Sequence, residues 1–123
     1  MASHTQWITL TSASFRHEVL NANTPVLVDC WASWCTAFHQ INPVVCGVAI
    51  DFSKHIKFGR LDVAIAQDWA TCYRIRAVPT LLFFKEGQVI DQVVGGLSEA
   101  ELNRRLISLI ALRTVSRSRV SCL

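Results

Sequence analysis

The chain has 123 residues, of which 51% are hydrophobic and 17% are charged, and this balance predicts one compact domain rather than a disordered segment. The net charge of +3 arises at the C-terminal end, because residues 1–112 hold nine Lys or Arg against nine Asp or Glu. Such a chain lacks the basic face that nucleic-acid binding requires. We predict a domain over 1–112 and a flexible basic tail over 113–123, which is either a frayed end or a weak electrostatic anchor for an acidic partner.

The five cysteines follow no spacing typical of a disulfide framework or a metal site, and the four histidines are scattered. We therefore expect free thiols, no metal and no cofactor. No N-terminal segment has the pattern of a signal peptide, and no apolar run has the length of a membrane span. Together these features predict a cytoplasmic protein, or one of the plastid stroma if it is processed from a longer precursor. The cysteines are Cys30, Cys35, Cys46, Cys72 and Cys122.

The first elements in chain order are a short strand, a helix and a buried strand. Residues 6–10 are rich in β-branched side chains, which favours a strand. Ser12 or Ser14 can cap the helical segment that follows. After a turn at 21–25, residues 26–31 are apolar at nearly every position, as in a strand buried on both faces.

The middle of the chain alternates helices and strands. From Cys35 to about Phe52, apolar residues recur at helical spacing, and Pro43 is expected to kink this helix. Residues 56–63 predict another strand, and 67–73 predict a short helix.

The end of the domain predicts a hairpin and a final helix. Strands over 80–84 and 89–94 are joined by a tight turn at Glu86-Gly87. A final helix then begins with a capping box, in which a serine is followed three residues later by a glutamate. The capping pair is Ser98 and Glu101, and the expected apolar stripe of the helix is Leu102, Leu106, Ile107 and Ile110.

The resulting order, β-α-β-α-β-α-β-β-α, predicts an α/β fold. Strands separated by helices pair in parallel through right-handed crossovers, and the hairpin adds antiparallel strands at one edge. We expect a mixed central sheet with helices on both faces.

The most informative segment, Trp34-Cys35-Thr36-Ala37-Phe38, lies between the buried strand and the long helix. A cysteine in that place normally has a second cysteine three residues later, giving Cys-x-x-Cys. Here Phe38 occupies the second position. The layout is that of a dithiol redox protein with one of its two thiols missing.

Over about residues 6–112 the chain resembles the thioredoxin family, whose fold is a mixed central sheet flanked by helices. The resemblance rests on several segments in the right order and at the right spacing. The departures are confined to the active-site loop, where Thr36-Ala37 replaces Gly-Pro and Phe38 replaces the resolving cysteine. The matching segments are 28–35, the helix proline Pro43, the cis-proline segment 75–80, the hairpin 84–87 and the turn 94–98.

The helix start expected at Cys35 favours a thiolate, which is the species that attacks disulfides. Without a second thiol, the mixed disulfide must be resolved by an external thiol such as glutathione, or persist. We expect a monothiol-type protein that exchanges with protein or glutathione disulfides and is impaired as a dithiol reductase. The alternative is a redox-silent binding module on the same scaffold. A weaker possibility is a peroxide sensor that forms a sulfenic acid.

Asp29 matches an aspartate that, in the family, assists the second cysteine, and Arg60 matches a nearby lysine of the family. A buried carboxylate is costly unless it is paired or protonated. Asp29 is therefore either a structural partner of Arg60, or a catalytic residue that acts on Cys35 or its adduct through water.

The resemblance also implies a docking surface for an extended substrate segment. Trp34, Val78, Pro79 and Gly95 are expected to contribute to it, with a cis Val78–Pro79 bond facing Cys35. The loop residues Thr36 and Ala37 are expected to line the same surface, with Phe38 just beneath it, either as part of the docking surface or as plain core. We expect protein disulfides or glutathione as partners, no nucleic acid or membrane, and a monomer.

Overall fold

The structure is a computed structural model that describes residues 7–34 and 43–113. Its centre is a five-stranded sheet in the order β1-β3-β2-β4-β5. β1, β3 and β2 pair in parallel, whereas β4 pairs antiparallel with both β2 and β5. The sequence analysis predicted this mixed sheet, and the prediction is confirmed. The strands are β1 (Ile8–Leu10), β2 (Val26–Trp31), β3 (Lys57–Asp62), β4 (Thr80–Lys85) and β5 (Gln88–Val94).

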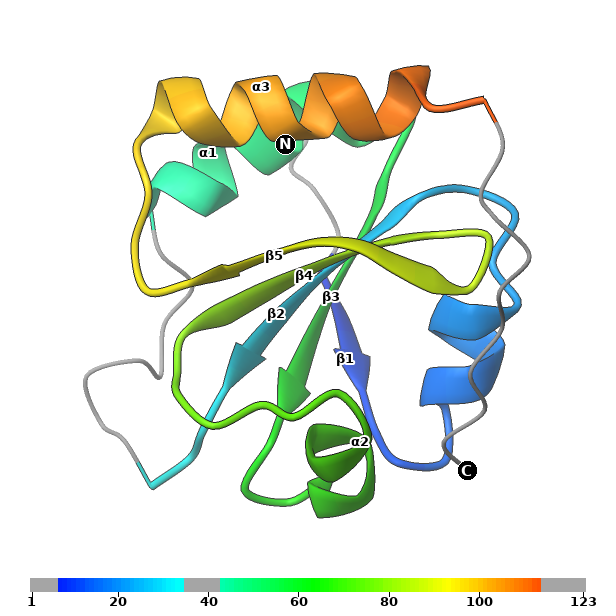
Figure 1. The fold of residues 1–123 in the computed structure, drawn as a ribbon, viewed down its shortest axis with the longest axis vertical. Helices are drawn as coiled ribbons and strands as arrows, with labels where there is room; N and C mark the ends of the chain where they lie inside the picture. The colour runs from blue at the N-terminus through cyan, green and yellow to red at the C-terminus, as the bar shows by residue number, and fades with distance from the viewer. Residues whose placement is uncertain (1–6, 35–42, 114–123) are drawn as a thin grey trace, which may run out of the picture.

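Helices cover both faces of the sheet (Figure 1). α1 (Pro43–Phe52) and α3 (Glu99–Ala111) lie together on one face. The short helices η1 (Arg16–Leu20) and α2 (Gln67–Cys72) pack on the other. No helix within 7–34 or 43–113 is long and apolar enough to cross a membrane.

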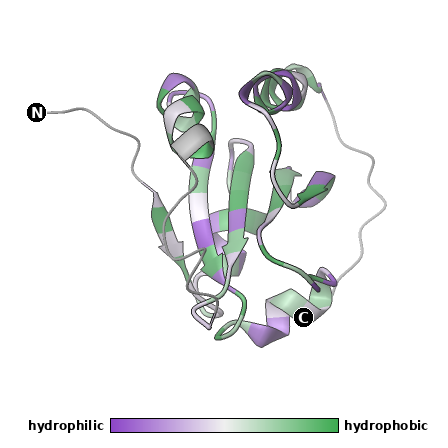
Figure 2. Cartoon of the chain, turned by 90° about the vertical axis from the view of Figure 1, so that its left-hand side faces the viewer, coloured by the Kyte–Doolittle hydropathy of each residue, from purple (hydrophilic) through white to green (hydrophobic). Residues whose placement is uncertain are grey.

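Two hydrophobic cores form because β2 is buried on both faces. Leu27 packs into the core beneath α1 and α3, while Val28 and Cys30 pack into the core beneath η1 and α2. β2 and β4 are accordingly largely hydrophobic, whereas β3 and the helices carry hydrophilic residues as well (Figure 2). This double burial fixes the register of β2, because a shift of one residue would exchange the side chains of its two faces.

Two sequence predictions about helices are corrected. The first helix is a π-turn, in which Asn21 N–H bonds to the carbonyl of Arg16. No side chain caps it; the hydroxyl oxygen of Ser14 instead accepts from the backbone N–H of Thr11.

The apolar stripe of α3 is the second correction. Its buried residues are Leu102, Leu106 and Leu109, whereas Ile107 is 57% exposed. At about 100° per residue, Leu109 lies about 20° from Leu102 around the helix, and Ile107 lies about 140° away.

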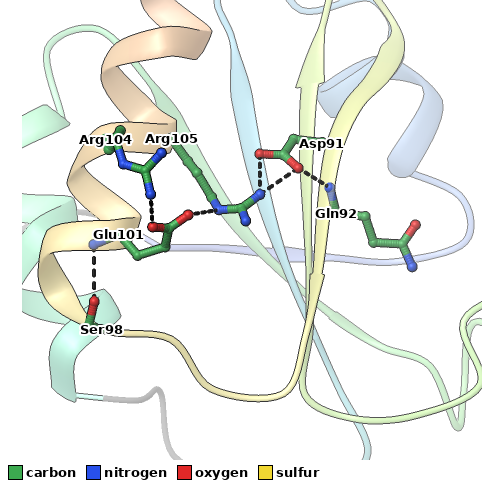
Figure 3. A network of polar contacts seen from close by, with 6 residues as sticks. All are labelled: Asp91, Gln92, Ser98, Glu101, Arg104 and Arg105. Atoms are coloured by element: carbon green, nitrogen blue, oxygen red, sulfur yellow. Dashed lines mark hydrogen bonds and ion pairs between the residues drawn. The ribbon is translucent and has the colours of Figure 1, made fainter.

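An ion-pair network joins the N-terminal half of α3 to β5 (Figure 3). Arg105 donates to both carboxylate oxygens of Asp91 at 2.7 Å and to Glu101 at 2.8 Å. Glu101 also pairs with Arg104, and its backbone N–H donates to the Ser98 hydroxyl. Of the predicted capping box, the serine cap is confirmed, while the glutamate side chain turns to the two arginines.

Candidate functional site

Four chain segments meet at one end of the sheet. Cys30, near the end of β2, is in register with Leu61 of β3 and with Thr80 of β4. Thr80 is in turn in register with Val94, the last residue of β5. The segments that follow β2, β3 and β5, and the one that precedes β4, therefore converge there.

The expected docking residues lie in these segments. The Val78–Pro79 bond is cis, as predicted. The backbone N–H of Gly95 donates to the carbonyl of Pro79 at 2.9 Å. Trp34 is 69% exposed and lines a cavity together with Val78. The structure thus brings Trp34, Val78, Pro79 and Gly95 to one end of the sheet.

The cavity beside Trp34 has a volume of about 460 Å³, which is within the usual range for ligand-binding pockets. It lies between α2 and the segments around it, and no described lining residue is acidic. Its lining consists of Trp34, Val63, Ala64, Gln67, Ala70, Thr71, Arg74, Ile75, Arg76, Ala77 and Val78.

Arg74 ends α2 in an unusual conformation. Its φ is +56°, in the left-handed region where glycine is normally found. The backbone N–H of Arg74 bonds to Thr71 O at 3.1 Å, and that of Ile75 bonds to Ala70 O at 2.8 Å. This pair of bonds is the Schellman motif, here closed by an arginine.

Asp29 lies beneath this end of the sheet, beside Arg60. The two residues are in register on β2 and β3, and Arg60 Nε lies 3.6 Å from Asp29 Oδ2. The Arg60 guanidinium also lies over the Trp31 ring, 4.6 Å from its centre. Burial raises the pKa of Asp29, and the positive charge of Arg60 offsets only part of this rise. The predicted pairing is confirmed, and the carboxyl keeps its proton to higher pH than an ordinary aspartic acid does.

The described cysteines differ in burial and in whether they are free or bonded in a disulfide. Cys30 is buried and free, and burial together with the Asp29 charge raises its pKa well above the ordinary thiol range, so it is a poor nucleophile. Cys46 is free and exposed on α1. Cys72 was expected to be a free surface thiol, and this is wrong: it is partly buried and bonded in a disulfide. A disulfide depends on which cysteines the fold brings together, which sequence spacing does not reveal.

The loop that carries the predicted nucleophile, Cys35 together with Thr36, Ala37 and Phe38, lies outside the described residues. So does the expected helix start at Cys35 and the expected kink before Pro43. Within the described part of the chain, no group of three or more His, Cys, Asp or Glu side chains is arranged to hold a metal ion.

The sequence analysis missed several functional candidates. Arg74 and Arg76 were not singled out, although the pattern Arg74-Ile75-Arg76 just before Val78-Pro79 was a usable signal. The contact between Arg60 and Trp31 depends on strand register, and no local pattern indicated it.

Comparisons with known proteins agree with the fold. The thioredoxin family model matches residues 6–108. The chain is 38% identical to a thioredoxin of Pyropia yezoensis over 102 residues, which cover 83% of this chain and 95% of that protein. It is 42% identical to a thioredoxin of Pseudomonas aeruginosa over 95 residues, covering 77% of this chain and 88% of that protein. The chain therefore belongs to the thioredoxin family.

Proposed function

We propose that this protein performs thiol–disulfide exchange through a single site cysteine, Cys35. Family membership implies a thiol–disulfide redox function, and the loop Trp34-Cys35-Thr36-Ala37-Phe38 contains only one thiol. The observation that carries the proposal is the position of Trp34, the residue immediately before Cys35. Trp34 lies three residues after the end of β2 and lines the cavity beside Val78.

The first step is attack by the Cys35 thiolate on one sulfur of a partner disulfide. A bond forms between Cys35 and that sulfur, the partner's S–S bond breaks, and the second partner sulfur leaves as a thiolate that takes up a proton. Asp29 is the residue we propose to exchange this proton through water, since its carboxyl has a raised pKa.

Glutathione completes the cycle in place of the missing second cysteine. One glutathione thiolate attacks Cys35 Sγ and releases the partner as a thiol. A second glutathione attacks the glutathione sulfur of the adduct, which regenerates the Cys35 thiolate. The balance is one partner disulfide and two glutathiones converted to two partner thiols and one glutathione disulfide.

This cycle requires Cys35 to be free, which bears on the Cys72 disulfide. Cys30 and Cys46 are free, so the sequence leaves Cys35 and Cys122 as possible partners of Cys72. We propose Cys122. A cytoplasmic or stromal location stays part of the proposal: the free Cys30 and Cys46 support a reducing compartment, whereas the Cys72 disulfide weighs against one.

The rival function is a redox-silent binding module. The observation that favours it is that the cavity beside Trp34 and the Val78-Pro79 segment has no cysteine among its described lining residues.

Insulin reduction separates the two functions. The parent should turn over when glutathione is the electron donor and should be nearly inactive with thioredoxin reductase. Cys35→Ser should lose turnover, and Cys46→Ser, a change at an exposed free thiol, should retain it. Absence of turnover with both donors supports the binding module, and reductase-driven turnover contradicts the single-thiol mechanism.

A further inference from the structure

We propose that the cavity beside Trp34 selects partner segments that carry Asp or Glu close to the reacting cysteine. This inference rests on the proposed function for the cysteine, but the recognition that it describes is non-covalent. Its occupant is an extended acidic segment of a partner protein.

The charge of the cavity is the first argument. Arg74 and Arg76 line it, and no acidic residue does so among the described ones. Neither guanidinium has an ion pair within the part of the chain that the structure describes. Asp62 is not among the residues that line the cavity, and its Oδ1 accepts from the backbone N–H groups of Ser33 and Ala64. The cavity therefore presents positive charge without a counter-charge of its own.

The chemistry of the lining also suits a carboxylate. Besides the two arginines, the polar residues Gln67 and Thr71 line the cavity, and arginine binds carboxylates in a planar, two-pronged geometry. The remaining lining is apolar, with Trp34 and Val78 among it. A peptide that carries both acidic and apolar side chains fits this lining better than an uncharged peptide does.

The backbone at Arg74 supplies an independent argument. A non-glycine residue at φ +56° is strained, and glycine would close the same Schellman motif without this cost. Arginine is thus a less favourable residue than glycine for ending the helix at this position. Arg74 lines the cavity instead, which is consistent with selection for binding.

Trp34 connects the cavity to the thiol along the chain. It lines the cavity and is the residue immediately before Cys35 in the sequence. An extended peptide advances about 3.3 Å per residue. The selected acidic residue should therefore lie within about three residues of the partner's cysteine.

The test uses fluorescence anisotropy with the full-length chain carrying Cys35→Ser. The probes are two labelled peptides with serine in place of the cysteine, one with glutamates within three residues of it and one with glutamines. We expect the glutamate peptide to bind about two- to tenfold more tightly at low salt, from two partly exposed ion pairs, and the preference to fall as salt is added.

Three variants locate the preference. Arg74→Gly and Arg76→Gln should each reduce it, and the double variant should remove it. Lys54→Gln, which removes one exposed charge near the start of β3 at the other end of the sheet, should leave it unchanged. Arg74→Gly should melt no lower than the parent, so a loss of binding cannot be attributed to unfolding.

Equal binding of the two peptides overturns the inference. So does a preference that survives in the double variant, since the arginines of residues 113–123 would then be its source. The measurement needs no exchange at Cys35, and its outcome is therefore independent of the insulin assay that tests the proposed function.

Discussion

Arg105 and Arg60 each lie beside a carboxylate that belongs to another element, but the two pairs are built differently. Arg105 meets Asp91 at 2.7 Å, with side chains 31% and 34% exposed, and it also bonds to Glu101. Arg60 approaches Asp29 only to 3.6 Å, with side chains 18% and 10% exposed. The better geometry is thus found where water already solvates the charges, and the poorer geometry where burial makes charge expensive.

The difference separates a structural pair from the pair whose carboxyl we propose as a proton exchanger. The Asp91 pair holds α3 on β5, and both carboxylate oxygens are engaged (Figure 3). At Asp29, burial outweighs the attraction of Arg60 and raises the pKa, while the guanidinium also lies over Trp31. A carboxyl left incompletely neutralised can take up and release a proton, which a fully paired one does poorly.

The largest expected effect comes from Phe38→Cys. This change restores Cys-x-x-Cys. It also supplies the second thiol that, by the family resemblance, Asp29 is expected to assist. Because an intramolecular thiol has a high effective concentration, insulin reduction with dithiothreitol as donor should rise about tenfold or more. The absence of Gly-Pro at Thr36-Ala37 should keep the rate below that of a complete dithiol site.

Asp29→Asn should stabilise the fold at neutral pH by on the order of 1 kcal/mol, while slowing exchange. The pKa of Asp29 is raised above its ordinary 3.8, so the folded chain favours the protonated carboxyl. That contribution is complete in acid and is lost as pH rises through the folded-state pKa. Thermal melts from about pH 4 to about pH 8 should show parent and variant alike in acid and diverging above.

The matched control for that series is Asp51→Asn, at an exposed position on α1, which should not change the pH dependence. A variant at position 29 that destabilises the protein at every pH would show that the Arg60 attraction dominates.

Asp91→Asn should destabilise the fold, whereas Asp29→Asn stabilises it, and its effect on the free energy of unfolding should be the smallest of the series. Loss of the charge weakens both contacts from Arg105, and the exposed setting limits the cost to about 0.5–1 kcal/mol. Chemical denaturation at low and high salt measures this cost, which should shrink with salt. Exchange activity should not change, and a clear fall in activity would remove the distinction between the two pairs.

The strands could be predicted from the sequence because hydrophobic runs determine them. Residues 26–31 were predicted as a buried strand, and β2 has these bounds. The cis bond at Val78–Pro79 was predicted from family resemblance. Most of the features that sequence reasoning missed depend on tertiary placement. The cavity and the Cys72 disulfide need the positions of distant segments. The left-handed Arg74 was missed because the sequence lacks the glycine that usually marks such a helix end.

The most direct test of the central claim is mass spectrometry of the native protein after exposure to glutathione disulfide, without reduction. The account predicts a glutathione adduct on Cys35 and none on Cys30, whose thiol is buried with a strongly raised pKa. The exposed Cys46 should react more slowly than Cys35, because the sequence predicts a helix start at Cys35, where a thiol is more acidic. An adduct that forms first on Cys46, or a peptide in which Cys35 is already bonded to Cys72, would contradict it.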